Sequence, residues 1–188
     1  AAGRGVAVMT FDSDAAQAKR FAFYGVDDIK TGKAVMDELA KQMGSKGSIA
    51  ILAGNQNAPN LRKRVEGVKE AAKAYPNIKI VDTFYHIETP QDAAAEVVRA
   101  QNAYPQIQGW AMIGCWPLFP PTLLTDLDAS TVQIVSVDAL PAELAWATLR
   151  KVEERGPGAK VSHLELFAIR KRLEIALDRN EPAVVIRR

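Results

Sequence analysis

The sequence predicts an α/β protein built on a doubly wound parallel sheet. Short apolar segments alternate along the chain with longer segments whose apolar residues recur at helical spacing. The short segments are continuously apolar, as expected for parallel strands that helices cover on both faces. The connections are also short, which favours right-handed strand–helix–strand units within one sheet.

The first elements follow this pattern in order. Residues 6–11 are expected to form a strand, and an irregular segment follows through residues 24–28. An apolar stripe at helical spacing then begins at Val35 and ends at Gly44. Residues 48–53 are the second expected strand. This strand and the helix before it complete the first unit.

The same cycle continues along the rest of the chain. A helix is expected from Leu61 to Tyr75, where Pro76 ends it. Three strand–helix pairs follow, with strands at 78–84, 110–113 and 132–137 and helices at 90–103, 123–127 and 142–152. After a polar break at 153–160, the chain is expected to form a helix at 164–177 and a last strand at 183–186. No internal repeat interrupts this order.

Composition excludes several functional classes. The 24 basic and 22 acidic side chains are interspersed and give a net charge of +2, which argues against nucleic-acid binding through this segment. The single cysteine, Cys115, excludes an intramolecular disulfide and a multi-cysteine metal site. The apolar runs are far shorter than a membrane-spanning helix needs. The first residues lack the features of a leader peptide, so either a leader was removed or the chain begins part-way through a longer protein, and we favour the second.

Polar residues follow the ends of most expected strands. Ligands of doubly wound sheets bind at the carboxyl edge, where these loops converge. The candidate ligand-binding residues are Asp12, Ser13, Asn57, Arg64, Glu88, Trp116 and Asp138. Carboxylates accept hydrogen bonds from hydroxyl groups, a guanidinium donates to oxygen atoms, and an aromatic ring covers the apolar face of a sugar. The set therefore predicts a neutral polyhydroxylated ligand.

Structural interpretations of the same residues stay open. Asp12 and Asp138 could cap a turn or a helix, and Arg64 could be a solvated helix residue. Trp116 could belong to the core, and His86 could be a structural histidine.

Signatures of catalysis are scarce. The sequence holds no G-x-S-x-G elbow, no phosphate-binding lysine loop, no G-x-G-x-x-G and no H-E-x-x-H. Its two histidines leave little scope for a Ser-His-Asp arrangement. We therefore expect no enzyme activity, no cofactor and no metal site.

Several segments together resemble the ribose-type sugar-binding proteins of the type 1 periplasmic family. They read VAVMTFDSDA, YGVDDIKTGKAVMDELAK, SIAILAGNQNAPNLRKRVEGVKEA, PNIKIVDTF and VQIVSVDALPAEL, in the family's order and near its spacing. The resemblance covers roughly residues 5 to 150. It implies that residues 1–27 belong to the first lobe and 28–150 form the second lobe, with an atypical C-terminal segment at 151–188. The chain thus resembles a truncated two-lobed protein with flavodoxin-like lobes.

The resemblance also assigns roles to residues. Asp12 matches the acidic residue that follows the strand entering the cleft, Arg64 matches the ligand-binding arginine, and Asp138 matches the acidic residue before a family proline. Ser13 stands where ribose binders often carry arginine, and Glu88 falls near an aromatic stacking position. The family's amide pair after the fourth strand is replaced, so that Trp116 would stack on the ligand instead.

The function implied is capture of a monosaccharide or similar polyol for a bacterial ABC uptake system. A membrane permease is the implied partner, and the periplasm is the implied location. The same fold and hinge occur in the effector-binding core of LacI-type regulators, which is the alternative, and a sugar-processing enzyme ranks third. We also expect a homodimer, because a missing lobe would leave apolar surface uncovered.

Overall fold

The computed structural model describes residues 2–119, 127–128, 131–137 and 184–185. The expected helices at 142–152 and 164–177, most of that at 123–127, and Asp138 lie outside these residues. The strands are β1 (Met9–Phe11), β2 (Ala22–Tyr24), β3 (Gly47–Ala53), β4 (Ile78–Tyr85), β5 (Gly109–Met112), β6 (Gln133–Ser136) and β7 (Val184–Val185). The helices are α1 (Asp28–Gln42), α2 (Pro59–Ala72) and α3 (Pro90–Ala103), with single 3₁₀ turns η1 (Ala2–Arg4) and η2 (Trp116–Leu118).

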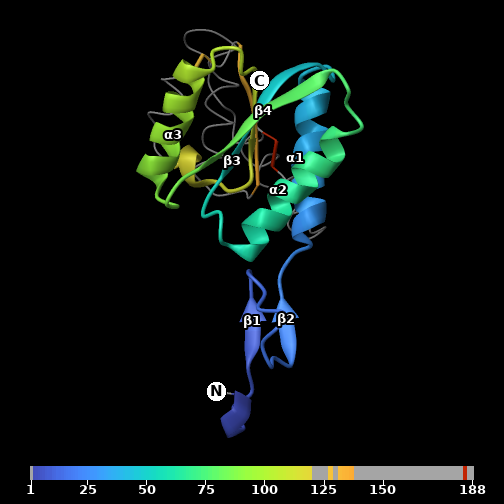
Figure 1. Ribbon diagram of the computed structural model, residues 1–188, viewed down its shortest axis with the longest axis vertical. Helices are drawn as coiled ribbons and strands as arrows, with labels where there is room; N and C mark the ends of the chain where they lie inside the picture. Colours follow the sequence, from blue (N-terminus) through green and yellow to red (C-terminus); the bar gives the residue numbers. More distant parts are fainter. Residues whose placement is uncertain (1, 120–126, 129–130, 138–183, 186–188) are drawn as a thin grey trace, which may run out of the picture.

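A five-stranded sheet in the order β4-β3-β5-β6-β7 forms the centre of the protein. Strands β3 to β6 are parallel, which confirms the predicted doubly wound α/β class. The last strand, β7, pairs antiparallel with β6, so the C-terminal segment adds an antiparallel edge to the sheet. Helices α1 and α2 cover one face and α3 covers the other (Figure 1).

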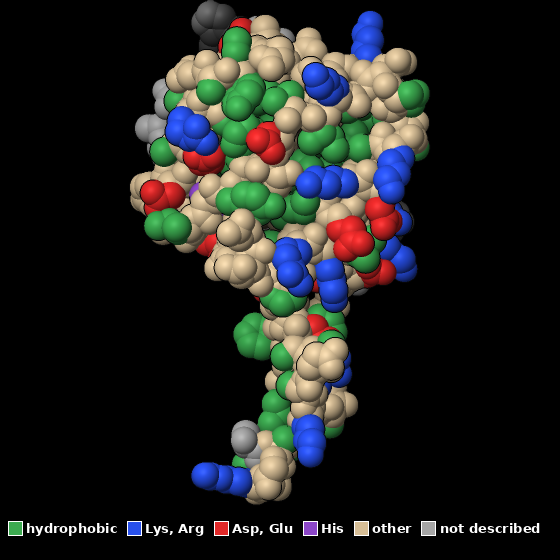
Figure 2. Space-filling view, in the orientation of Figure 1, with side chains coloured by type: hydrophobic (Ala, Val, Ile, Leu, Met, Phe, Trp, Pro, Cys, Tyr) green, Lys and Arg blue, Asp and Glu red, His purple; other side chains and the backbone are tan. Residues whose placement is uncertain are grey.

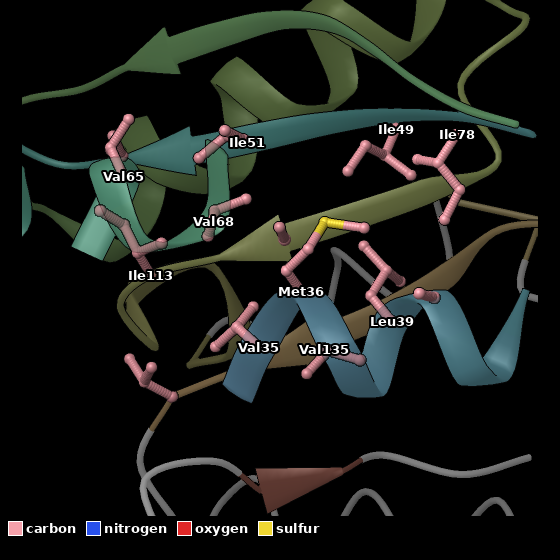
Figure 3. Close-up of a cluster of buried hydrophobic side chains, with 14 of the residues drawn as sticks. Val35, Met36, Leu39, Ile49, Ile51, Val65, Val68, Ile78, Ile113 and Val135 are labelled. Carbon is pink, nitrogen blue, oxygen red and sulfur yellow. The ribbon is translucent and has the colours of Figure 1, made fainter. Parts of the chain in front are cut away.

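Alternating residues of the strands supply two apolar clusters, one on each face. In β3, Ile49 and Ile51 pack under α1 and α2, whereas Ala50 and Leu52 pack against α3. Strand side chains point to opposite faces in turn, so a continuously apolar strand serves both helical layers. Figure 3 shows the first cluster, where side chains from α1 meet those of the strands and α2.

Glycines bring α1 and α2 into direct backbone contact. A Cβ atom placed on Gly32 would lie 2.0 Å from the carbonyl oxygen of Arg64, and one on Gly67 would lie 2.1 Å from that of Ile29. Real side chains cannot occupy that space, so the two helices approach this closely only because both positions lack a side chain. The contact fixes the middle of α2 against the first turns of α1.

The N-terminal residues form a small separate sheet that projects from the main body (Figure 1). Strand β1 is shorter than the predicted strand at 6–11, and it pairs in parallel with β2. Strand β2 lies in a segment where no strand was expected, because a three-residue strand is too short to show periodicity. Apolar side chains lie on the surface of this projection (Figure 2). They include Val6, Met9, Phe11, Phe21 and Tyr24, which are more than half exposed.

Within the described residues, no helix combines the length and the apolar character that crossing a membrane requires.

Candidate functional site

The loops at the carboxyl edge of the main sheet carry most of the predicted site residues. Strands β3, β4 and β5 end at Ala53, Tyr85 and Met112, and the helices that follow begin beside these ends. The β1–β2 unit lies on this same side, next to the N-terminal ends of α1 and α2 (Figure 1). The edge is therefore bordered by loops from both parts of the protein.

Asp12 joins the β1–β2 unit to the main body. Its carboxylate accepts a hydrogen bond from the side-chain amide of Asn60, in the first turn of α2, over 3.3 Å. Asp12 is exposed and has a left-handed backbone with φ of 58°. Residues outside glycine adopt this conformation rarely, and it is often found at functional sites. Ser13 follows it and is half-buried.

A bidentate ion pair stabilises the loop that contains Asp12 and Ser13. Arg20 donates from Nε and Nη2 to the two carboxylate oxygens of Asp14, and Thr10 donates to the same carboxylate. The hydrogen bond from Arg20 lowers the pKa of Asp14 below its ordinary value. The carboxylate of Asp14 is thus occupied by hydrogen bonds within its own loop. Asp12 is the carboxylate of this loop that faces the edge of the main sheet.

Arg64 is buried rather than displayed at the edge. Its Nε donates to Asp28 in the first turn of α1 over 2.9 Å, and its Nη1 donates to the carbonyl oxygen of Ile113 over 3.2 Å. The residue is 8% exposed and Asp28 is 5% exposed. Arg64 therefore ties α1, α2 and the end of β5 together, and a ligand could reach only the remaining part of its guanidinium group.

Arg62 is a neighbouring cation that the sequence analysis did not select. It is exposed and borders a hollow of about 80 Å³ after the ends of β3 and β4. The lining residues are Ala53, Asn55, Gln56, Leu61, Arg62, Val65 and Tyr85. Helical spacing could have shown which arginine is buried and which is exposed. Arg64 lies on the buried stripe of Leu61, Val65 and Val68, whereas Arg62 does not.

Glu88 connects the loops that follow β3 and β4. Its Oε1 accepts a hydrogen bond of 2.9 Å from the backbone N–H of Asn55. The same carboxylate lies over Gly54, where an added Cβ would be 2.8 Å from Oε1. Glu88 has a left-handed backbone with φ of 64°, which a glutamate adopts only where the surroundings enforce it. Asn57 is exposed on the first of these loops, and its N–H donates to the side chain of Asn55 over 2.9 Å.

Trp116 and His86 form an aromatic pair at the same edge. Their ring centroids lie 5.2 Å apart with an interplanar angle of 73°. Trp116 is half-buried and occupies the space that Gly114 leaves after β5. His86 follows β4, is 8% exposed, and accepts the N–H of Glu88 at Nδ1 over 2.9 Å. Burial is the main cause that lowers the pKa of His86 below 6.5, against the opposing effect of Glu88, Glu96 and Asp92.

Most of the predicted residues therefore surround one edge, although they are not equivalent there. Asp12, Asn57, Glu88 and Trp116 lie on its loops, and Arg64 lies beneath them. Asp138 is outside the described residues, and Val137 before it donates to the carbonyl oxygen of Met112 at the end of β5. The described part of the chain contains no group of His, Cys, Asp and Glu side chains arranged to hold a metal ion.

The fold is shared with solved structures of binding proteins. A chain of the XylFII-LytSN complex is 29% identical with a TM-score of 0.71, and the match covers 77% of this chain and 54% of that one. GanP, a glucose-galactose binding protein from Geobacillus stearothermophilus, is 21% identical with a TM-score of 0.72, over 79% of this chain and 54% of its own. AraP, an arabinose binding protein from the same organism, is 22% identical with a TM-score of 0.67, over 79% and 52%.

These matches also show how much of each solved protein the chain covers. It spans about half the length of the chains just named, as the predicted truncation requires. At these identities the likeness to GanP and AraP concerns the fold alone. No protein with a curated description matches the sequence. The model of the periplasmic binding protein domain matches residues 1–153, and the chain therefore belongs to the periplasmic binding protein family.

Proposed function

We propose that this chain forms one wall of the sugar site of a solute-binding protein that serves ABC-type uptake. Two observations carry the proposal. Asp12 of the projecting unit accepts a hydrogen bond from Asn60 at the beginning of α2, and the loops after β3, β4 and β5 contact one another at the same edge. Such an edge is where ligands of this sheet type bind. Membership of the periplasmic binding protein family supports the same conclusion.

The side chains at this edge suit a neutral polyol. The carboxylates of Asp12 and Glu88 accept hydrogen bonds from hydroxyl groups, and Arg62 donates to oxygen atoms from beside the hollow. Trp116 offers an aromatic face to the apolar side of a sugar ring. Asn57, Ser13, Asp138 and the accessible part of Arg64 complete the proposed set. None of these roles requires a bond to break, so the proposed function is non-catalytic.

Affinity in a two-lobed binding protein comes from closure around the ligand. A sugar held between two walls favours the closed state by the difference between its affinities for the closed and open states. The hydrogen bond between Asp12 and Asn60 lies where the two parts of this chain meet. We infer that this connection sets the position of the first lobe relative to the second. The closed form would be recognised by a membrane permease outside the cytoplasm.

The direct test is titration of the full chain with D-arabinose, D-glucose, D-galactose, D-allose and D-fructose, followed by ¹⁵N-resolved NMR. We expect weak binding, because one wall buries only part of a small ligand. Shifts should gather at residues 54–57, 86–88 and 114–116. Spectra that stay unchanged for every sugar would refute the proposal.

A matched pair of variants locates the site. Asp12→Asn removes one carboxylate charge, and we expect it to weaken binding about tenfold, since hydrogen bonds to charged groups are the strong ones. Asp82→Asn makes the same change at an exposed position of β4 and should leave affinity unchanged. Equal affinities for the two variants would remove Asp12 from the site.

A further inference from the structure

One ring nitrogen of His86 forms a hydrogen bond, whereas the other forms none within the described part of the chain. Its Nδ1 accepts the backbone N–H of Glu88, so the neutral ring carries its proton on Nε2. That Nε2 is buried, and no group in the described part of the chain forms a hydrogen bond with it. A buried donor that forms no hydrogen bond is costly and therefore rare. The position calls for an explanation beyond packing.

The surroundings of His86 do not satisfy this donor by themselves. The ring contact with Trp116 is edge to face, and an aromatic face is a much weaker acceptor than an oxygen atom. The charged groups that act on the ring are Glu88 on its own loop and Asp92 and Glu96 on α3, all of them acidic. They favour an imidazolium cation, but burial outweighs them and keeps the ring neutral.

Trp116 is the ring that lies against His86. It is half-buried, begins the 3₁₀ turn η2, rests over Gly114 and packs against the border of the first apolar cluster. His86 is held more firmly, because its Nδ1 bond belongs to the same loop that Glu88 attaches to Asn55. Trp116 is the less buried of the two rings, so we expect it to be the one that turns when a ligand approaches His86.

We propose that His86 is a further ligand-contacting residue of the site, with its Nε2–H donating to a ring or hydroxyl oxygen once Trp116 turns away from it. The inference rests on the proposed sugar-binding function and adds a neutral donor to the acceptors Asp12 and Glu88. A polyol offers both donors and acceptors, which this combination requires. The ligand oxygen supplies the partner that Nε2 lacks in the free chain.

The proposal makes binding depend on the protonation of His86. In the imidazolium form Nδ1 also carries a proton, which would point at the N–H of Glu88 and break the bond that orders the loop. Binding should therefore be constant above pH 6.5, the ordinary pKa of histidine, and weaken as the pH falls through the lowered pKa of His86.

The first experiment examines the free chain with ¹⁵N-labelled histidine. We expect His86 to be the neutral Nε2–H tautomer with a lowered pKa, and Trp116→Ala to raise that pKa toward 6.5 by admitting water. A proton on Nδ1, or a pKa that Trp116→Ala leaves unchanged, would overturn the arrangement on which the proposal stands. This measurement needs no ligand.

The second experiment measures affinity for the same five sugars. In His86→Asn the amide oxygen can still accept the N–H of Glu88, whereas the Nε2 donor is lost. We expect binding to weaken about fivefold, as for one neutral hydrogen bond. Asp82→Asn, at an exposed position of β4, is the control and should bind like the wild type. The amide shift of Glu88 in His86→Asn verifies that the loop is kept.

The outcomes separate the two proposals. If the wild type binds none of the five sugars, the sugar-binding function fails and this inference fails with it. If the wild type binds a sugar and His86→Asn binds it equally well, only the role of His86 is refuted.

Discussion

The ion pair between Arg64 and Asp28 is expected to stabilise the fold strongly at the scale of single residues. Both side chains are almost completely buried, so removing one partner leaves a charge without compensation. Asp28→Leu should therefore lower the free energy of unfolding by about 3 kcal/mol in urea denaturation. The double variant Asp28→Leu, Arg64→Met should recover most of this loss, because it leaves no buried charge behind.

A surface pair serves as the control for this prediction. Lys33 and Glu70 also connect α1 and α2, with 2.8 Å between Nζ and Oε2, but their side chains are 44% and 39% exposed. Lys33→Met should therefore change stability by less than about 1 kcal/mol. A loss in Lys33→Met as large as that in Asp28→Leu would show that burial is not the cause.

His86 should give the protein a stability that depends on pH. Its pKa in the folded chain is lowered below the ordinary value of 6.5, so the fold disfavours the protonated form. The contribution is complete above pH 6.5 and is lost as the pH falls through the lowered pKa. Urea midpoints should therefore drop more between neutral and acidic pH in the wild type than in His86→Asn. A wild-type profile that His86→Asn reproduces would contradict this assignment.

The sequence predicted the edge of the sheet more reliably than the exposure of each side chain there. Asp12, Asn57, Glu88 and Trp116 lie on loops at one edge, as expected of residues that follow parallel strands. It was harder to predict that Arg64 is buried and Arg62 exposed, because both follow the same strand and differ only in the direction in which they point from the α2 axis. The role that we propose for His86 has no signal in the sequence, since it depends on a hydrogen bond and a ring contact that only the folded chain brings together.

At the scale of elements, the contact between α1 and α2 is the most sensitive to substitution. Alanine normally favours a helix over glycine by about 1 kcal/mol. At Gly67 the added Cβ would lie 2.1 Å from a backbone carbonyl oxygen, which cannot rotate away as a side chain could. Overpacking should prevail, so Gly67→Ala should lower the free energy of unfolding by about 2 kcal/mol. Gly3→Ala is the control, because nothing lies within 4 Å of its Cβ position.

Periodicity predicted the longer elements closely and the short ones poorly. Most helices and strands of the main body start and end within a few residues of the expected positions, because their apolar residues repeat over one or more turns or pleats. The exception is α1, which begins at Asp28 rather than at Val35, because its first two turns carry few apolar residues. Strand β2 and the 3₁₀ turn η2 have three residues each, too few to establish a period. Their structure depends on partners, namely β1 for β2 and the loop over Gly114 for η2.

At the scale of the whole molecule, the β1–β2 unit should promote self-association. Two strands with exposed apolar side chains are only marginally stable alone, and Phe11, Phe21 and Tyr24 are between 72% and 77% exposed. We expect light scattering to report a mass above that of the monomer. Replacing these three residues together by serine should restore the monomer mass, whereas Phe119→Ser, a change on the main body, should not. A monomer in the unaltered chain would contradict the prediction.

The sequence by itself determined the fold class, the order of the long elements and the edge of the sheet at which polar loops gather, because these follow from local periodicity and from the direction of parallel strands. Only the tertiary structure decided which side chains at that edge are available. Arg64 is engaged by Asp28, Glu88 by Asn55, and His86 keeps one donor unused behind Trp116. The reason is physical: burial and hydrogen bonding depend on neighbours that are distant along the chain, and no local pattern records them.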